Sequence, residues 1–229
     1  MITAGEIISY SEMCRIEDVN TLQRGMNFRI KINYSIVLMS RRNNAPYLDK
    51  IEKNGQLLIY EGHNISKKDT HENPKTVDQP LRTPNGSLTQ NGKFFEAALK
   101  SKENTDSVEL VKVYEKIYSG VWVYNGLFKL VDALIETTDK RKVFKFNLEL
   151  TDQTLSTESG DLKHNRVIPA KVKQEVWKRD QGRCVQCGKD NNLHFDHIIP
   201  YSKGGSSLLA DNIQILCARH NLSKHDLIV

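Results

Sequence analysis

The sequence predicts an α+β protein in two parts: a curved β-sheet or barrel, followed by a small module that zinc stabilises. Three observations predict it. Segments with the apolar pattern of β-strands occupy the first two-thirds of the chain, a polar stretch begins at Thr151, and closely spaced Cys and His residues follow. A chain of 229 residues can form two modest domains, each with its own core. We therefore expect domains at residues 1–150 and 166–229, joined by a linker at residues 151–165.

The first part contains short apolar or alternating segments that favour β-strands over helices. The expected strands are residues 28–32, 35–39, 56–60, 108–114, 120–124 and 143–150. Asn54-Gly55, a dipeptide typical of hairpin turns, precedes the third of them. One helix is expected at residues 91–100, and Trp122 is expected in the core. Many short strands with few helices favour a curved sheet or barrel.

The second part begins after a stretch, residues 151–161, that has almost no apolar side chains. Pro169 is suited to open a helix that runs to about Asp180. Val172, Val176 and Trp177 would share one face of that helix. A strand, a loop at Gly204-Gly205, a second strand and a final helix are expected to follow.

The net charge of +5 is unevenly distributed along the chain. Residues 163–229 contain 11 Lys and Arg against 6 Asp and Glu, whereas the preceding 162 residues contain 22 of each. A locally basic module fits a polyanion such as nucleic acid, although a solvated basic face explains the charge equally well. No apolar run has the length of a membrane span, and the N-terminus lacks a signal-peptide pattern. We expect a cytoplasmic protein of a bacterial or archaeal cell, with no membrane partner.

Three of the four cysteines cluster in the second part, where they predict a metal site. Cys184-Val-Gln-Cys187 and Cys217-Ala-Arg-His220 share a two-residue spacing between metal ligands. Together they supply the Cys3His set of a closed structural Zn²⁺ site. The alternatives are cysteines that are merely buried and a His220 that acts in catalysis instead. Cys14 is expected to be a small buried side chain.

The segment between these pairs resembles the HNH (ββα-metal) nuclease family. The resemblance covers about the last 60 residues and rests on Asp196-His197-Ile-Ile-Pro200, Gly204-Gly205, Asn212 before the final cysteine, and Asn221-Leu-Ser-Lys224. It implies that His197 is the general base, that Asn212 braces the loop, and that Asp196 and Asn221 hold the catalytic metal. The chain would then be an HNN variant.

The chemistry of phosphodiester hydrolysis supports these roles. An imidazole can deprotonate water near neutral pH, and a cation can neutralise the charge that develops on the phosphate. A carboxylate and an amide oxygen suit one Mg²⁺ or Mn²⁺ ion that keeps several waters. Lys203, Arg219 and Lys224 are candidate phosphate contacts. His194 should share a strand face with Asp196, where it either contacts phosphate and metal-bound water or faces solvent.

An ordered set of short motifs in the first part resembles the SRA (YDG) family, which binds DNA by flipping out a modified cytosine. The set comprises Tyr34–Ser40, Tyr47-Leu-Asp49, Asn54-Gly55, Tyr60-Glu-Gly62, Val77-Asp78-Gln79 and Val123-Tyr124-Asn125-Gly126. Two departures stand out. The name-giving Tyr-Asp-Gly is Tyr-Asn-Gly here, and His63-Asn64 replaces the family's Gly-Gly-Arg-Asp run.

This resemblance implies that Tyr47 and Tyr60 sandwich the flipped base and that Asp49 reads its polar edge. Lys50 could align with the family carboxylate instead, but only a carboxylate can accept a hydrogen bond from the cytosine amino group. Both tyrosines could also be packing residues at strand ends. The pairs Gln23-Arg24 and Lys67-Lys68 fall where loops of the family enter the duplex.

Taken together, the two resemblances predict a modification-dependent DNA endonuclease. It would recognise 5-methylcytosine or 5-hydroxymethylcytosine in duplex DNA, hydrolyse nearby phosphodiester bonds to leave a 5′ phosphate, and so restrict modified foreign DNA. Because one active site cuts one strand, we expect a homodimer or two molecules on one DNA. The alternatives are an HNH endonuclease specific for unmodified sequence, a non-catalytic reader of modified DNA, and an RNA-binding module.

Overall fold

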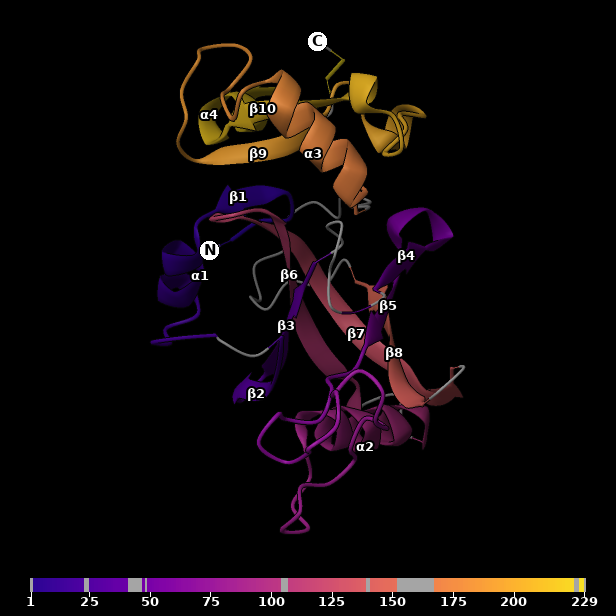
Figure 1. The fold of residues 1–229 in the computed structure, drawn as a ribbon. Helices are drawn as coiled ribbons and strands as arrows, with labels where there is room; N and C mark the ends of the chain where they lie inside the picture. Colours follow the sequence, from indigo (N-terminus) through magenta and orange to yellow (C-terminus); the bar gives the residue numbers. More distant parts are fainter. Residues whose placement is uncertain are drawn as a thin grey trace.

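A computed structural model describes residues 2–22, 25–40, 47, 49–103, 107–138, 141–151, 167–224 and 227–228. Within these residues ten strands join into one sheet that extends through both parts of the chain (Figure 1). The strands are β1 (Glu6–Ile8), β2 (Met26–Lys31), β3 (Tyr34–Met39), β4 (Lys50–Glu52), β5 (Leu57–Glu61), β6 (Glu109–Tyr118), β7 (Val121–Thr137), β8 (Lys142–Leu150), β9 (Leu193–His197) and β10 (Ile213–Cys217). The helices are α1 (Tyr10–Ile16), α2 (Gln90–Glu103), α3 (Ala170–Arg179) and α4 (Ala218–Lys224).

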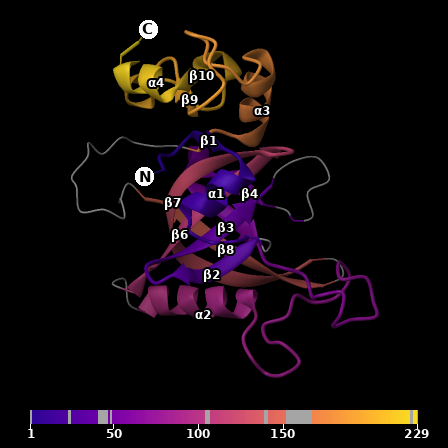
Figure 2. The ribbon, with the colours of Figure 1, turned by 90° about the vertical axis from the view of Figure 1, so that its left-hand side faces the viewer.

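The long strand β7 organises this sheet. Its first half lies between β1 and β6, and its second half pairs with β8. From β6 the order continues through β3 to β2, and from β8 through β5 to β4. The pairing of β3 with β6 is parallel and the other strand pairs are antiparallel, so the sheet is mixed. Figures 1 and 2 show its strong curvature, which confirms the predicted α+β class and curved sheet.

Two of the three apolar clusters among the described residues pack against the SRA-like part of the sheet, one with α2 and one with α1. Helix α2 lies across one end, as Figure 2 shows, and inserts Phe94 between Phe28 and Phe146 at ring-centroid distances of 5.4 and 5.9 Å. Burying one such phenylalanine contributes about 1.5–3 kcal/mol. Helix α1 belongs to another cluster, which includes Trp122, as expected, and Met13.

The predicted strands and the predicted helix are present, but their lengths differ from expectation. The largest difference is β7, expected at residues 120–124, which continues to Thr137. A register shift between Leu130 and Asp132 interrupts the apolar alternation there, so the second half of the strand escapes a period-two search. Strands β1 and β4 were not predicted because three residues are too few to show a period. Helix α1 could have been found from Ser9 and Glu12, which form a capping box.

The C-terminal part has the predicted order of helix, strand, loop, strand and helix. Val172 and Val176 are buried and Trp177 is partly buried, so the expected apolar face of α3 is confirmed. Their cluster also contains Ile117 and Val123 from β6 and β7. The expected linker lies outside the described residues except for Thr151.

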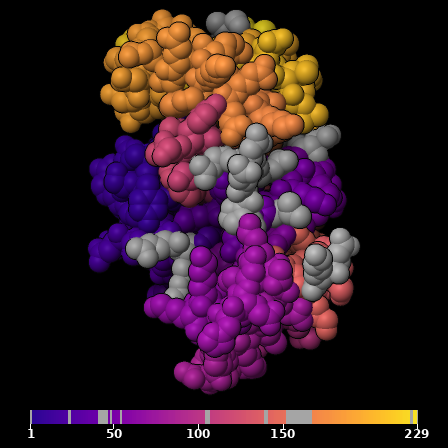
Figure 3. All heavy atoms as spheres, viewed as in Figure 1, coloured from indigo at the N-terminus to yellow at the C-terminus, as the bar shows by residue number. Residues whose placement is uncertain are grey.

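The two parts are joined by main-chain hydrogen bonds as well as by this shared core. Strand β1 pairs on one side with β7 and on the other with β9. Phe195 N donates to Gly5 O at 3.0 Å, and Gly5 N donates to Tyr124 O at 2.8 Å. A Cβ atom at Gly5, where φ is +87°, would lie 2.9 Å from Phe195 O, so this contact requires glycine. Figure 3 shows the C-terminal residues, in orange and yellow, packed directly on the rest of the chain.

A buried ionic cluster crosses the same junction. Lys173 on α3 is 1 % exposed, and its Nζ lies 2.7 Å from Glu115 Oε2 on β6. Lys173 also donates to Asn125 Oδ1, while Asn125 Nδ2 donates to Glu115 Oε2 at 3.1 Å. Asn125 therefore acts as acceptor and donor at once, which an ionised aspartate cannot do. This requirement explains why the motif reads Tyr-Asn-Gly in this chain.

We expect Lys173→Met to lower the free energy of unfolding by about 3–5 kcal/mol, because it leaves the Glu115 carboxylate buried and uncompensated. Denaturant unfolding of the full chain measures this change. The exposed Lys171 of the same helix provides the matched control, and Lys171→Met should change the stability by less than about 0.5 kcal/mol. Equal effects of the two substitutions would contradict the role assigned to the ion pair.

Candidate functional site

The four expected zinc ligands converge on one point. Their ligand atoms, from Cys184, Cys187, Cys217 and His220, all lie within 4.8 Å of one another. His220 Nδ1 is 3.2 Å from Cys184 Sγ and 3.5 Å from Cys217 Sγ, and the sulfur atoms of Cys187 and Cys217 are 3.9 Å apart. Usual zinc–ligand distances in a tetrahedron place sulfur and nitrogen about 3.6 Å apart and two sulfurs about 3.8 Å apart. The donor set and its geometry fit a structural Zn²⁺ ion, with His220 as the fourth ligand.

Local backbone structure orients these four side chains toward the common point. The turn after Cys184 is closed by Gly188 N, which donates to Cys184 O at 2.8 Å, and Gly188 adopts a φ of +71°. Cys217 ends β10 and His220 follows in the first turn of α4. Burial raises the pKa of Cys184, but hydrogen bonds from His220 and nearby backbone N–H groups outweigh it and lower the pKa to about 6. The thiolate that a metal requires is therefore favoured. Cys14 is buried elsewhere, as expected.

Strand β9 carries Asp196 and His197 at its end. The side chain of Asp196 is 19 % exposed, and its Oδ2 lies 2.9 Å from Lys224 Nζ. Lys224 Nζ also donates to the main-chain oxygen of His197 at 2.6 Å. Lys224, one of the candidate phosphate contacts, is buried, and its ammonium group connects α4 to the end of β9. Lys203 and Arg219, the other two candidates of this module, are exposed.

The imidazole of His197 is oriented by the loop that follows β9. Its Nε2 lies 2.8 Å from the hydroxyl oxygen of Ser207, a buried residue. If Nε2 carries the proton and donates it to this oxygen, Nδ1 keeps a free lone pair, as a general base requires. Burial lowers the pKa of His197, with Asp196 opposing and Lys224 reinforcing the shift, so the neutral imidazole is favoured. No sequence signal pointed to Ser207, because a serine in a loop can serve many other purposes.

Asn212 stabilises this loop by hydrogen bonds to its main chain. Its Oδ1 accepts from Ile199 N at 2.8 Å, and its Nδ2 donates to the main-chain oxygens of Ile199 and Ser206, each at 3.1 Å. A Cβ atom at Gly205 would lie 1.7 Å from Ile199 O, so only glycine fits where the loop closes. The amide thereby fixes the segment that presents Ser207 to the imidazole.

Asn221 and His194 complete the set of residues expected near the catalytic centre. Asn221 is half-buried on α4, next to the zinc ligand His220. His194 is 6 % exposed, which excludes the solvent-facing alternative. Within the described residues its Nδ1 has no hydrogen-bond partner, and burial lowers its pKa against the opposing effect of Glu6 and Asp196. It lies in the junction opposite Glu6 of β1.

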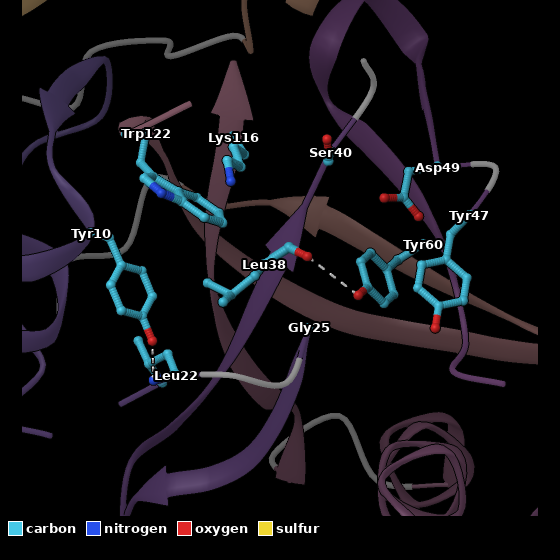
Figure 4. Close-up of a pocket in the computed structure, with 11 residues that line it drawn as sticks. Tyr10, Leu22, Gly25, Leu38, Ser40, Tyr47, Asp49, Tyr60, Lys116 and Trp122 are labelled. Carbon is cyan, nitrogen blue, oxygen red and sulfur yellow. Dashed lines mark hydrogen bonds between the residues drawn. The ribbon is translucent and has the colours of Figure 1, made fainter. Parts of the chain in front are cut away.

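A pocket of about 460 Å³ opens in the first part of the chain, between β3, β5, β6 and β7 (Figure 4). Tyr47, Asp49 and Tyr60, the three residues expected to bind a base, all line it. Lys50 does not line it and is exposed on β4. The opposite side contributes Tyr10 and two residues that the sequence did not indicate as ligand contacts, Lys116 and Trp122.

Asp49 and His63 determine the chemistry of the pocket beside Tyr47 and Tyr60. Burial raises the pKa of Asp49 to about 7 despite hydrogen bonds from the backbone N–H groups of Glu61 and Ser40. The ring of Tyr47 stacks on His63 with centroids 5.6 Å apart, and Tyr60 Oη lies 3.5 Å from His63 Nε2. His63 therefore supports both tyrosines from a position where the sequence departs from the family pattern.

The four residues expected on DNA-entering loops are only partly described. Lys67 and Lys68 lie exposed in a turn that the hydrogen bond from Asp69 N to Ser66 O closes. Gln23 and Arg24 lie outside the described residues. No helix within the described residues is long and apolar enough to cross a membrane.

Comparison with known families agrees with this arrangement of two sites. Residues 2–154 match the SAD/SRA domain model, which covers more than half of the chain. The chain belongs to the SAD/SRA domain family. Residues 184–227 match the HNH endonuclease model, so an SRA domain precedes a small HNH domain. No curated protein matches the chain.

Several solved structures are similar to this SRA–HNH chain. The SUVH5 SRA complex with hemimethylated CG DNA is 21 % identical, with a TM-score of 0.46 over 69 % of this chain and 94 % of that one. The SUVH5 SRA complex with fully hydroxymethylated CG DNA is 19 % identical, with a TM-score of 0.47 over 69 % and 95 %. The modification-dependent TagI restriction endonuclease is 18 % identical, with a TM-score of 0.41 over 96 % of this chain and 76 % of that one. The family assignment rests on the two domain models, since these likenesses are low.

Proposed function

We propose that this protein is an endonuclease that cleaves duplex DNA carrying 5-methylcytosine or 5-hydroxymethylcytosine. The observation that carries the proposal is the presence, in one continuous sheet, of an aromatic pocket with a buried carboxylate and of an HNH centre. The similarity to a modification-dependent restriction endonuclease is in keeping with it. The biological role would be restriction of modified foreign DNA inside a bacterial or archaeal cell.

Recognition would proceed by flipping the modified base into the pocket. Tyr47, which stacks on His63, offers an aromatic ring on which a base can stack. Asp49 can accept a hydrogen bond from the cytosine amino group, and in its protonated form it can also donate one to the ring nitrogen. Tyr60, whose hydroxyl lies 3.4 Å from Leu38 O, would close the other side.

Hydrolysis would take place at His197. The imidazole, held by Ser207, would remove the proton from the attacking water. Asp196 and Asn221 offer the oxygen ligands of one Mg²⁺ or Mn²⁺ ion, which stabilises charge on the phosphate when bound. Lys224 and the main chain of β10 hold Asp196 in place. Since the described residues of each chain form one such centre, cleavage of both strands would need a homodimer or two molecules on one DNA.

Digestion of three otherwise identical duplexes, with cytosine, 5-methylcytosine or 5-hydroxymethylcytosine at one position, tests the proposal. We expect cleavage of at least one modified duplex with Mg²⁺, and none without a divalent metal. Equal cleavage of all three would instead show an HNH endonuclease that reads unmodified sequence. Binding of modified DNA without cleavage would show a silent reader, and preference for RNA in a competition assay would show an RNA-binding module.

A further inference from the structure

The pocket has a second, positively charged end that the base-binding residues do not use. Lys116 on β6 lines the same pocket as Asp49, and Figure 4 shows its amino group directed into the space between Trp122 and Ser40. Its Nζ lies 5.7 Å from the centre of the Trp122 ring. A cation therefore stands at one end of the pocket and a carboxyl group at the other.

Lys116 differs from the buried lysines of this protein in its surroundings. Lys112, Lys145, Lys173 and Lys224 each have a carboxylate oxygen within 2.7–2.9 Å of Nζ. Within the described part of the chain Lys116 forms no ion pair, although it is half-buried. Removing a charge from water without a partner is costly. The Trp122 ring offers Lys116 a cation–π contact but no negative charge, so the ammonium group is suited to an anion that comes with the ligand.

Lys116 is the one cationic side chain among the described residues that line the pocket. Trp122 offers an apolar face, and the hydroxyl of Tyr10 is already within 2.8 Å of Leu22 N and 3.1 Å of Thr21 Oγ1. No carboxylate lines this end among the described residues. A nucleotide is complementary to this pocket. Its aromatic base can hydrogen-bond at the carboxyl end, and its phosphate can bind the cation at the other end.

We propose that Lys116 binds a backbone phosphate beside the flipped nucleotide, so that the pocket holds a nucleotide and not only a base. The inference rests on the proposed function. This contact forms only when the base is flipped, because only then do the flanking phosphates approach the pocket. Lys116 would thus contribute to the affinity for modified DNA and not to general DNA binding.

The test measures binding of the full chain, without added Mg²⁺, to a 5-methylcytosine duplex and to its unmodified counterpart. Lys116→Gln should weaken binding to the modified duplex about tenfold or more, as expected for a lost hydrogen bond to a charged group. It should also reduce the slope of log K against log salt concentration for that duplex by about one, the value for one lost phosphate contact. Lys116→Arg, which keeps the charge, should restore most of the affinity. Melting temperatures of both variants establish that they fold.

The matched control is Lys100→Gln, which removes one exposed charge from α2, a helix that does not line the pocket. It should affect both duplexes equally. A third duplex, with neutral methylphosphonates on either side of the modified cytosine, completes a double-mutant cycle. On this duplex Lys116→Gln and the unaltered protein should bind alike.

The inference would be overturned if Lys116→Gln lost as much affinity for unmodified as for modified DNA. It would also be overturned if the variant lost as much affinity for the methylphosphonate duplex as for the ordinary modified duplex. Either result would leave the proposed function standing. Equal binding of modified and unmodified DNA by the unaltered protein would refute the proposed function itself. The two failures are therefore distinguishable.

Discussion

His197→Ala is expected to slow DNA cleavage by about a thousandfold or more, within the range that a general base contributes. Without the imidazole the attacking water would lose its proton to solvent water, which is a far weaker base. Binding of modified DNA should stay within about twofold of the unaltered protein, because His197 lies in the HNH domain, outside the base pocket. Single-turnover cleavage, followed beside a binding titration, measures both effects.

The matched control for this substitution is His71→Ala, which makes the same change at an exposed residue of the SRA domain. It should leave both cleavage and binding unchanged. Full cleavage by His197→Ala would mean that another group deprotonates the water, and the proposed mechanism would fall. Loss of cleavage together with loss of the folded state would be visible in the melting temperature.

Cys184→Ser is expected to remove the zinc ion and to lower cleavage by about a hundredfold or more, since zinc contributes roughly 10–16 kcal/mol to the folding of small zinc-binding peptides. Helix α4 has only seven residues; Cys217 precedes it, and it carries His220, Asn221 and Lys224. A helix so short is unstable without tertiary contacts. Its loss would release both the Asn221 amide, which we propose binds the catalytic metal, and the lysine that contacts Asp196.

Zinc loss should not unfold the whole module, because β9 and β10 extend the sheet of the SRA domain through β1. We expect faster hydrogen exchange confined to residues 184–189 and 218–224, and near-normal binding of modified DNA. Zinc content, exchange and cleavage should be measured on the same preparation. The control is Cys14→Ser, which changes the buried cysteine outside the cluster. This variant should retain the zinc ion. Zinc retained by Cys184→Ser, or cleavage unaffected by its loss, would contradict this role.

Much of the HNH domain could be predicted from the sequence because its motifs lie close together along the chain. Two-residue spacings between zinc ligands, a Gly-Gly loop and the dipeptide Asp196-His197 occupy fixed positions along a short segment. Strand β9, helix α4 and the convergence of Cys184 with His220 follow from that order. The SRA domain was harder to read because its strands are paired across long separations, and the bulge in β7 concealed half of that strand.

Several features had no sequence signal because they depend on what lies across the fold. Lys224 was a candidate phosphate contact, but its buried ammonium group contacts Asp196 and the main-chain oxygen of His197 at the end of β9. His63, Ser207 and Lys116 are ordinary residues until the neighbouring strands and loops place them beside Tyr47, His197 and the pocket.

The sequence by itself determined the α+β class, the order of the two domains and the residues offered for metal, hydrolysis and base binding. Only the tertiary structure decided how the two domains are joined. Strand β1 hydrogen-bonds to both, and the buried pair of Lys173 and Glu115 crosses between them. The physical reason is that periodicity and motif spacing report local chemistry, whereas strand partners and buried ion pairs are selected by groups distant in sequence that must be satisfied once water is excluded.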